Sequence, residues 1–353
     1  MIYDFFAASN SKDGFKSYFS DIFSEEKLTR LFIIYGGSGS GKSTLMKNAA
    51  AYFSESGKNV DVFHCSADPD SYDGLLIDGR VGIVDGTAPH IVFPVYPGAF
   101  ETVINTGECW DIDILSSHRQ EIKDLIVNKS KFFIRAYRFL KAAGEIENER
   151  ISILMPYIER GKMHSAAARA VNADIKCGNT VTDEIRITKA ITSRGYVNLD
   201  GLERLCEKKI FIDDALGLGH LYLQSIKTTA SVKNQRSITS YDPIMSDRMD
   251  ALVFPDAGTG YFCKNRKECK TEPYKWINMR RFISNAVISS NKSRLKFSAS
   301  CRDAVIDGAV RNFSEANKLH ELVEEYYISA MDYNKCDTLT FKVIREAEKS
   351  LNA

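Results

Sequence analysis

Short apolar runs alternate along the chain with longer segments in which apolar residues recur at helical spacing. Residues 31–35 (LFIIY) form a short, partly β-branched apolar run, which is typical of a strand buried on both faces. Residues 45–52 are rich in alanine and predict a helix, while residues 60–64 and 80–85 predict two further strands. Residues 115–173 combine helical periodicity with many charges. Strands interleaved with helices indicate an α/β fold.

The segment between the first predicted strand and helix reads GGSGSGKST and fits the pattern G-x-x-x-x-G-K-[ST]. Its glycines let successive backbone N–H groups point at phosphate oxygens, and a helix N-terminus adds partial positive charge there. Lys42 is expected to reach the β- and γ-phosphates, and the Ser43 hydroxyl to ligate magnesium. The sequence therefore predicts a phosphate-binding loop (P-loop) for a nucleoside triphosphate with Mg²⁺. The predicted binding residues are Gly36, Gly37, Ser38, Gly39, Ser40, Gly41, Lys42, Ser43 and Thr44.

A P-loop site also needs an acidic residue at the end of a second strand to help hold the metal. The strand at residues 80–85 ends at Asp85, which is therefore the candidate metal ligand, although Asp-Gly is also ordinary turn chemistry. Asp68 follows the strand at residues 60–64 and is a second catalytic candidate beside Lys42 and Asp85. Asp68 precedes a proline, so a simple turn is an equal alternative. His90 suits either a catalytic or a structural role.

The second half of the chain repeats features of the first in the same order. Aligning Gly217 with Gly39 and Gly219 with Gly41 places His220 at the position of Lys42 and Leu221 at that of Ser43. The other matches pair residues 190–196 with 7–15, 242–243 with 68–69, 252–256 with the strand ending at Asp85, and 320–322 with 118–125.

We interpret these matches as a tandem duplication whose second copy has lost the phosphate lysine and the metal-binding hydroxyl. Two unrelated domains with chance similarity are the alternative. The predicted fold is α/β, with two P-loop NTPase-like three-layer domains in tandem, at residues 1–180 and 181–353, and a helical segment between them.

Composition limits the partners. The 353 residues carry 47 Lys and Arg against 46 Asp and Glu, a net charge of +1, so no general basic field for nucleic acid or an anionic membrane is indicated. The eight cysteines are scattered, which fits a reducing compartment. Neither a signal peptide nor an apolar membrane span is evident in the sequence. We therefore expect a cytoplasmic protein.

Several segments together resemble a bacterial family of tandem P-loop ATPases. These are residues 5–10 (FFAASN), the glycine-rich loop, residues 63–70 (FHCSADPD) and residues 85–90 (DGTAPH). The resemblance covers nearly the whole chain and is closest over residues 1–145. It implies ATP binding and hydrolysis. Members of that family carry glycine-rich loops in both halves, whereas this chain departs from the pattern at residues 214–221.

Three functions fit these patterns. The first is a magnesium-dependent ATPase with one active site in the first half and a regulatory or docking second half. The second is a P-loop kinase, with a small acceptor bound near Asp68, Asp85 and His90. The third is a nucleotide-gated switch with negligible turnover that engages an unidentified protein or nucleic-acid partner.

Overall fold

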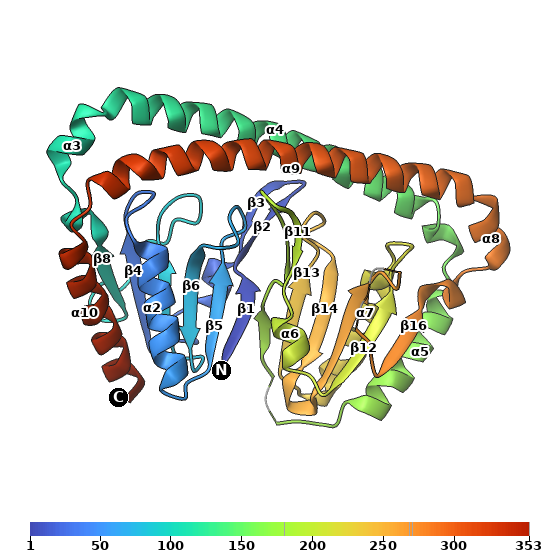
Figure 1. The fold of residues 1–353 in the computed structure, drawn as a ribbon. Coiled ribbons are helices and arrows are strands. Elements are labelled where there is room, and N and C mark those ends of the chain that lie inside the picture. The colour runs from blue at the N-terminus through green and yellow to red at the C-terminus, as the bar shows by residue number, and fades with distance from the viewer. Residues whose placement is uncertain (180, 268, 270, 353) are drawn as a thin grey trace.

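The computed structural model describes residues 1–179, 181–267, 269 and 271–352, and it has an α/β fold with two six-stranded mixed sheets (Figure 1). The first sheet has the order β1 (Ile2–Phe6), β5 (Val60–His64), β6 (Tyr72–Ile77), β7 (Val81–Asp85), β4 (Arg30–Tyr35) and β8 (Glu101–Asn105). The second has the order β16 (Lys275–Asn278), β12 (Lys208–Asp213), β15 (Thr259–Lys264), β14 (Met249–Phe254), β13 (Ser237–Tyr241) and β9 (Asp183–Ile185).

The two sheets have the same topology when the second is followed from β9 to β16. In the first sheet β6 is antiparallel to both of its neighbours and every other pair is parallel. In the second sheet β14 has that same antiparallel place. Each half also has a small hairpin, β2 (Ala8–Ser11) with β3 (Gly14–Ser17), and β10 (Lys189–Thr192) with β11 (Gly195–Asn198). The halves are therefore structural repeats.

Alternation of side chains along each strand creates two apolar faces per sheet. Phe32 and Ile34 of β4 join the outer core of the first sheet, with helices α2 (Lys42–Glu55) and α10 (Tyr333–Asn352). The outer core of the second sheet contains α7 (Gly219–Ala230) and α5 (Arg160–Asp174).

The halves thus exchange helices, because α5 follows the first sheet in sequence yet packs on the second, and α10 does the reverse (Figure 1). The predicted boundary between residues 180 and 181 separates the sheets but not these helices, and residue 180 itself lies outside the described residues.

Residues from one face of each sheet belong to a single apolar cluster, which joins the two predicted domains. Phe5, Phe63 and Ile33 of the first sheet belong to the same cluster as Phe211 and Phe262 of the second. The short helices α1 (Phe19–Ile22) and α6 (Gly201–Arg204) contribute to this cluster. Phe23, which follows α1, lies against Gly74 and Gly82 of the first sheet, and Cys206, which follows α6, lies against Gly260 of the second.

Long helices span both halves at the end of the sheets where the glycine-rich loop lies (Figure 1). Helices α3 (Ile112–Ser117) and α4 (Arg119–Ser152) form the helical segment between the sheets, together with α5. Helices α8 (Asn285–Ser290) and α9 (Lys292–Ser329) follow the second sheet, and α9 runs alongside α4 in the opposite direction. Short 3-10 turns lie at Thr106–Cys109, Met155–Tyr157, Ser231–Lys233, Pro255–Ala257 and Met279–Phe282. Among the described helices, none has the length and apolar character needed to cross a membrane.

The topology corrects three of the internal matches proposed from the sequence. The counterpart of β7 is β15. Ile34 of β4 pairs with Asp85, and its counterpart Ile212 of β12 pairs with Cys263. Asp85 therefore corresponds to Cys263 rather than to Asp256. Residues 242–243 follow β13 directly, whereas residues 68–69 lie beyond a longer turn after β5.

The match of residues 320–322 with 118–125 is also wrong. His118 is the residue directly before α4 begins, whereas His320 lies in the last third of α9.

The packing of α10 on the first sheet can be tested by a substitution that creates a cavity between them. Val343 lies fully buried between α10 and the first sheet. Val343→Ala should lower the free energy of unfolding by roughly 2 kcal/mol, because it removes buried methyl groups and leaves a void. Lys349→Ala, on the exposed side of α10, is the control and should change little. Equal stability of the two variants in urea titrations would contradict the packing described.

Candidate functional site

The glycine-rich loop connects the end of β4 at Tyr35 to the start of α2 at Lys42. Gly39 and Gly41 have φ values of +68° and +78°, in the left-handed region that favours glycine. Gly41 is the N-cap of α2, and no side-chain hydrogen bond caps the helix there. The first N–H groups of a helix lack intrahelical acceptors, so this end of α2 is suited to bind an anion.

Lys42 is folded back over its own loop. Its ammonium donates to the carbonyl oxygens of Gly36 and Gly37 at 2.9 and 2.7 Å, and it lies 3.6 Å from Oδ2 of Asp85. The side chain is largely buried, with 11% exposed. The loop therefore holds a positive charge beside its backbone amides and next to the end of β7.

The hydroxyl residues of the loop have different surroundings. Ser43 Oγ accepts a hydrogen bond from the Tyr72 amide at 3.0 Å, while the neighbouring Thr44 is exposed. Ser40 is buried, donates to the Gly37 carbonyl at 2.8 Å and accepts from Thr106 Oγ1 at 3.0 Å. Ser40 thus stabilises the turn, whereas Ser43 retains oxygen lone pairs for a further ligand.

Helix α9, from the second half of the chain, packs against the outside of this loop. A Cβ atom on Gly39 would lie 2.8 Å from the backbone oxygen of Glu324, and one on Gly37 would lie 2.8 Å from the Tyr327 ring. His320 Nδ1 lies 3.3 Å from Ser38 Oγ. The second half therefore contributes part of the surface around the loop.

Charged groups of the long helices surround the same place. The ammonium of Lys129 on α4 lies 3.1 Å from His320 Nδ1. Burial, together with Lys129 and Lys42, lowers the pKa of His320 to about 4. Burial raises the pKa of Glu324, and the Gly39 amide opposes that rise. Glu324 of α9 therefore lies beside Gly39 of the loop.

Asp85 lies at the end of β7, as the sequence predicted, and His90 and the unpredicted Asp73 lie close to it. Asp85 Oδ1 accepts from the Thr87 amide at 2.8 Å and from its hydroxyl. Asp73 on β6 is 7% exposed, and His90 Nδ1 lies 3.9 Å from its Oδ2. Burial raises the pKa of Asp73 to about 6, with His90 opposing the rise and Asp85 adding to it. Asp73 is the functional candidate that sequence analysis missed.

A sequence signal for Asp73 exists in the internal repeat. Residues 72–76 read YDGLL and residues 249–253 read MDALV, so the aspartate recurs at the same place of β6 and β14. Asp68, by contrast, lies apart from the Asp73, Asp85 and His90 group. Its carboxylate accepts from the Ser71 hydroxyl at 3.0 Å and lies 3.7 Å from Arg194. These contacts are typical of a turn tied to the second half.

In the loop between β12 and α7, Asp214 has the position that Gly36 has in the first loop. Gly217 has a φ of +73°, close to that of Gly39, which supports their alignment. Asp214 follows β12 as Gly36 follows β4, and its Oδ1 accepts from the amide of Gly219 at 2.6 Å. A carboxyl side chain therefore satisfies the start of α7. The lysine position is held by His220, whose pKa burial and Arg248 lower to about 4.

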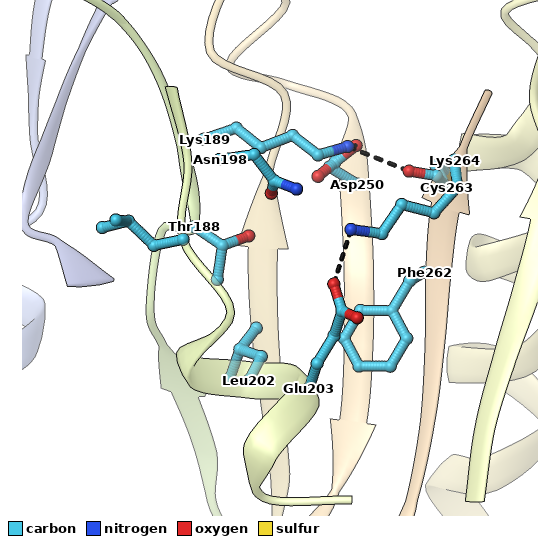
Figure 2. Close-up of a pocket in the computed structure, with 10 residues that line it drawn as sticks. Thr188, Lys189, Asn198, Leu202, Glu203, Asp250, Phe262, Cys263 and Lys264 are labelled. Carbon is cyan, nitrogen blue, oxygen red and sulfur yellow. Dashed lines mark hydrogen bonds and ion pairs between the residues drawn. The ribbon is translucent and has the colours of Figure 1, made fainter. Parts of the chain in front are cut away.

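The second half also carries its own cation, shown in Figure 2. Lys189 of β10 donates to Asp250 Oδ1 at 2.7 Å and to the backbone oxygen of Cys263 at 2.9 Å. Asp250 and Cys263 are the counterparts of Asp73 and Asp85. The ammonium thus lies between those two positions.

Comparison of the chain with models of protein families, with curated proteins and with solved structures gave no match.

The role of Asp214 predicts a pH-dependent stability difference. Burial raises the pKa of Asp214 from 3.8 to about 7, so wild-type stability should fall as the pH rises through that interval. Asp214→Asn keeps an oxygen for the Gly219 amide but cannot ionise. In urea titrations the variant should gain stability relative to wild type between about pH 5 and about pH 8. Asp213→Asn is the matched control, and an Asp214→Asn difference independent of pH would contradict this role.

Proposed function

We propose that the first half binds ATP with magnesium through a P-loop at residues 36–43 and hydrolyses it, and that the second half regulates this site. The observation that carries the proposal is the contrast between the two loops. The second loop satisfies its helix N-terminus with the Asp214 carboxyl, whereas the corresponding residue of the first loop is Gly36, which has no side chain. An external anion with phosphate chemistry suits that place, since Lys42 adds a positive charge.

The surrounding fold is consistent with a P-loop NTPase-like domain. Strands β4 and β7 are parallel neighbours, so the loop and Asp85 lie at the same edge of the sheet. Lys42 would exchange its contacts with the Gly36 and Gly37 carbonyls for contacts with phosphate oxygens, because those carbonyls are the weaker partners.

The donor set suits magnesium. Ser43 Oγ and the Asp85 carboxylate are oxygen donors, which Mg²⁺ prefers, and Ser43 keeps a lone pair beyond its bond from Tyr72. When bound, the ion supplies neutralisation of the phosphate charge. Asp85, 3.6 Å from Lys42, would position that charge beside the lysine.

A nucleotide-gated switch is the second candidate, and the position of α9 favours it. The helix belongs to the second half yet contacts the loop through its Glu324 backbone and Tyr327. Nucleotide binding that displaces these contacts would be transmitted along α9 to the second sheet. The rate of ATP hydrolysis distinguishes the ATPase from the switch, because the switch has negligible turnover.

Lys42→Ala tests the proposed site directly. The substitution should lower the rate of phosphate release from ATP and magnesium on the order of a hundredfold, because one charge that stabilises the transferred phosphoryl group is lost. Lys47→Ala, on the exposed side of the same helix, should keep wild-type turnover. Binding of ATP without turnover in the wild type would identify a switch. Absence of ATP binding in the folded wild type would refute both functions.

Substitution of Glu324 should have the opposite effect to that of Lys42 and strengthen ATP binding. The backbone of Glu324 packs against Gly39, so its carboxylate places a negative charge near the loop. Glu324→Ala should therefore tighten ATP binding about fivefold in calorimetric titrations, since a negative charge near the phosphates is removed. Glu325→Ala removes the same charge at the next, exposed position and should leave the affinity unchanged. Equal effects in both variants would show a general charge effect only.

A further inference from the structure

Asp73, Asp85 and His90 form a group whose potential ligand atoms all lie within 4.8 Å of one another. Asp73 lies on β6, Asp85 at the end of β7, and His90 on the segment that follows. The His90 side chain is 5% exposed, and neither ring nitrogen has a hydrogen-bond partner among the described residues. Its ring stacks on Phe19 at 4.6 Å. A buried imidazole without hydrogen bonds, facing two carboxylates, needs an explanation.

In the second half, a buried cation lies beside the counterparts of Asp73 and Asp85. There Asp250 is the counterpart of Asp73, and the buried Lys189 ammonium lies 2.7 Å from its carboxylate (Figure 2). The same ammonium bonds the backbone oxygen of Cys263, the counterpart of Asp85, at 2.9 Å. A side-chain cation therefore occupies the place between these two positions, as buried carboxylates require a counter-charge.

The first half lacks that side-chain cation. The residue equivalent to Lys189 is Ala8, because each begins the first strand of its hairpin. Lys42 approaches from the other side, but its hydrogen bonds are to the Gly36 and Gly37 carbonyls, and it lies 3.6 Å from Asp85. A carboxylate pair and an unbonded imidazole thus take the place of the internal ion pair.

We propose that Asp73, Asp85 and His90 bind a divalent transition-metal ion, with the metal in the first half taking the place that the Lys189 ammonium has in the second. An imidazole nitrogen with two carboxylates favours a first-row transition metal such as Mn²⁺ or Co²⁺ over calcium or magnesium. Ligands around such an ion lie about 2.0–2.2 Å from it, so the group has to contract slightly on binding. Histidine is the donor that distinguishes this site from the magnesium site at Ser43.

The site shares Asp85 with the proposed magnesium site, but its metal is held without nucleotide. The chain has eight free cysteines, whose thiolates bind zinc and also Co²⁺, so Mn²⁺ is the main probe and Co²⁺ the spectroscopic one. Full-length protein is titrated with each metal in the absence of nucleotide, by calorimetry and, for Co²⁺, by visible absorption. We expect a single Mn²⁺ ion per chain, and a visible Co²⁺ band that changes in His90→Gln.

His90→Gln and Asp73→Asn should each weaken Mn²⁺ binding by at least about tenfold while circular dichroism shows a native fold. His164→Gln, which removes an exposed histidine of α5, should bind like wild type. Lys42→Ala should retain the metal, so loss of nucleotide binding and loss of metal binding are separable. Wild-type affinity in both ligand variants would overturn the proposal, as would the absence of Mn²⁺ binding at millimolar concentration.

Discussion

Buried charge at the loop edge of the two sheets needs a counter-charge close by, and the rest of the molecule is arranged around that constraint. A carboxylate removed from water is costly unless an opposite charge or several donors satisfy it. In the second half the chain supplies both signs itself, with Lys189 against Asp250 at 2.7 Å and Asp214 against the Gly219 amide at 2.6 Å. The first half has neither Lys189 nor Asp214 at the equivalent positions. One copy is thus closed by its own side chains, and the other is suited to external ions.

The exchange of α5 and α10 explains why these unequal halves stay together. Each outer core is completed by a helix that follows the other sheet, so removing either half exposes the apolar face of the remaining one. One apolar cluster joins the two sheets, and the end of β1 meets the segment after β9, where the Phe6 amide donates to the Ile187 carbonyl at 2.7 Å. Separation into two independent domains would therefore expose large apolar surfaces to water. Each half is therefore part of the core of the other.

Local sequence patterns predicted the individual strands and the loop. The features that the sequence did not predict depend on packing between distant segments. The strand at 31–35, the glycine-rich loop and the strand ending at Asp85 depend on short-range pattern and were placed correctly. The alignment of later segments failed because the equivalent of β7 lies beyond an antiparallel strand, so Asp256 was matched in place of Cys263. The contact of α9 with the loop joins residues far apart in sequence and leaves no periodic signal. Burial of His90 is likewise a tertiary property.

The glycines and the lysine of the first loop carry different information. Gly217 of the second loop keeps the left-handed φ of Gly39, although its loop lacks the lysine and the serine. Side chains of Glu147 and Arg150 occupy the space where a Cβ on Gly217 would lie, just as the α9 backbone approaches Gly39. Close helix packing is thus sufficient to require glycine in either loop. Lys42 has no such packing role, since its ammonium contacts two backbone carbonyls, Ser40 and Asp85 of its own site. The phosphate chemistry proposed for the first loop therefore depends on Lys42 and on the missing carboxyl at Gly36.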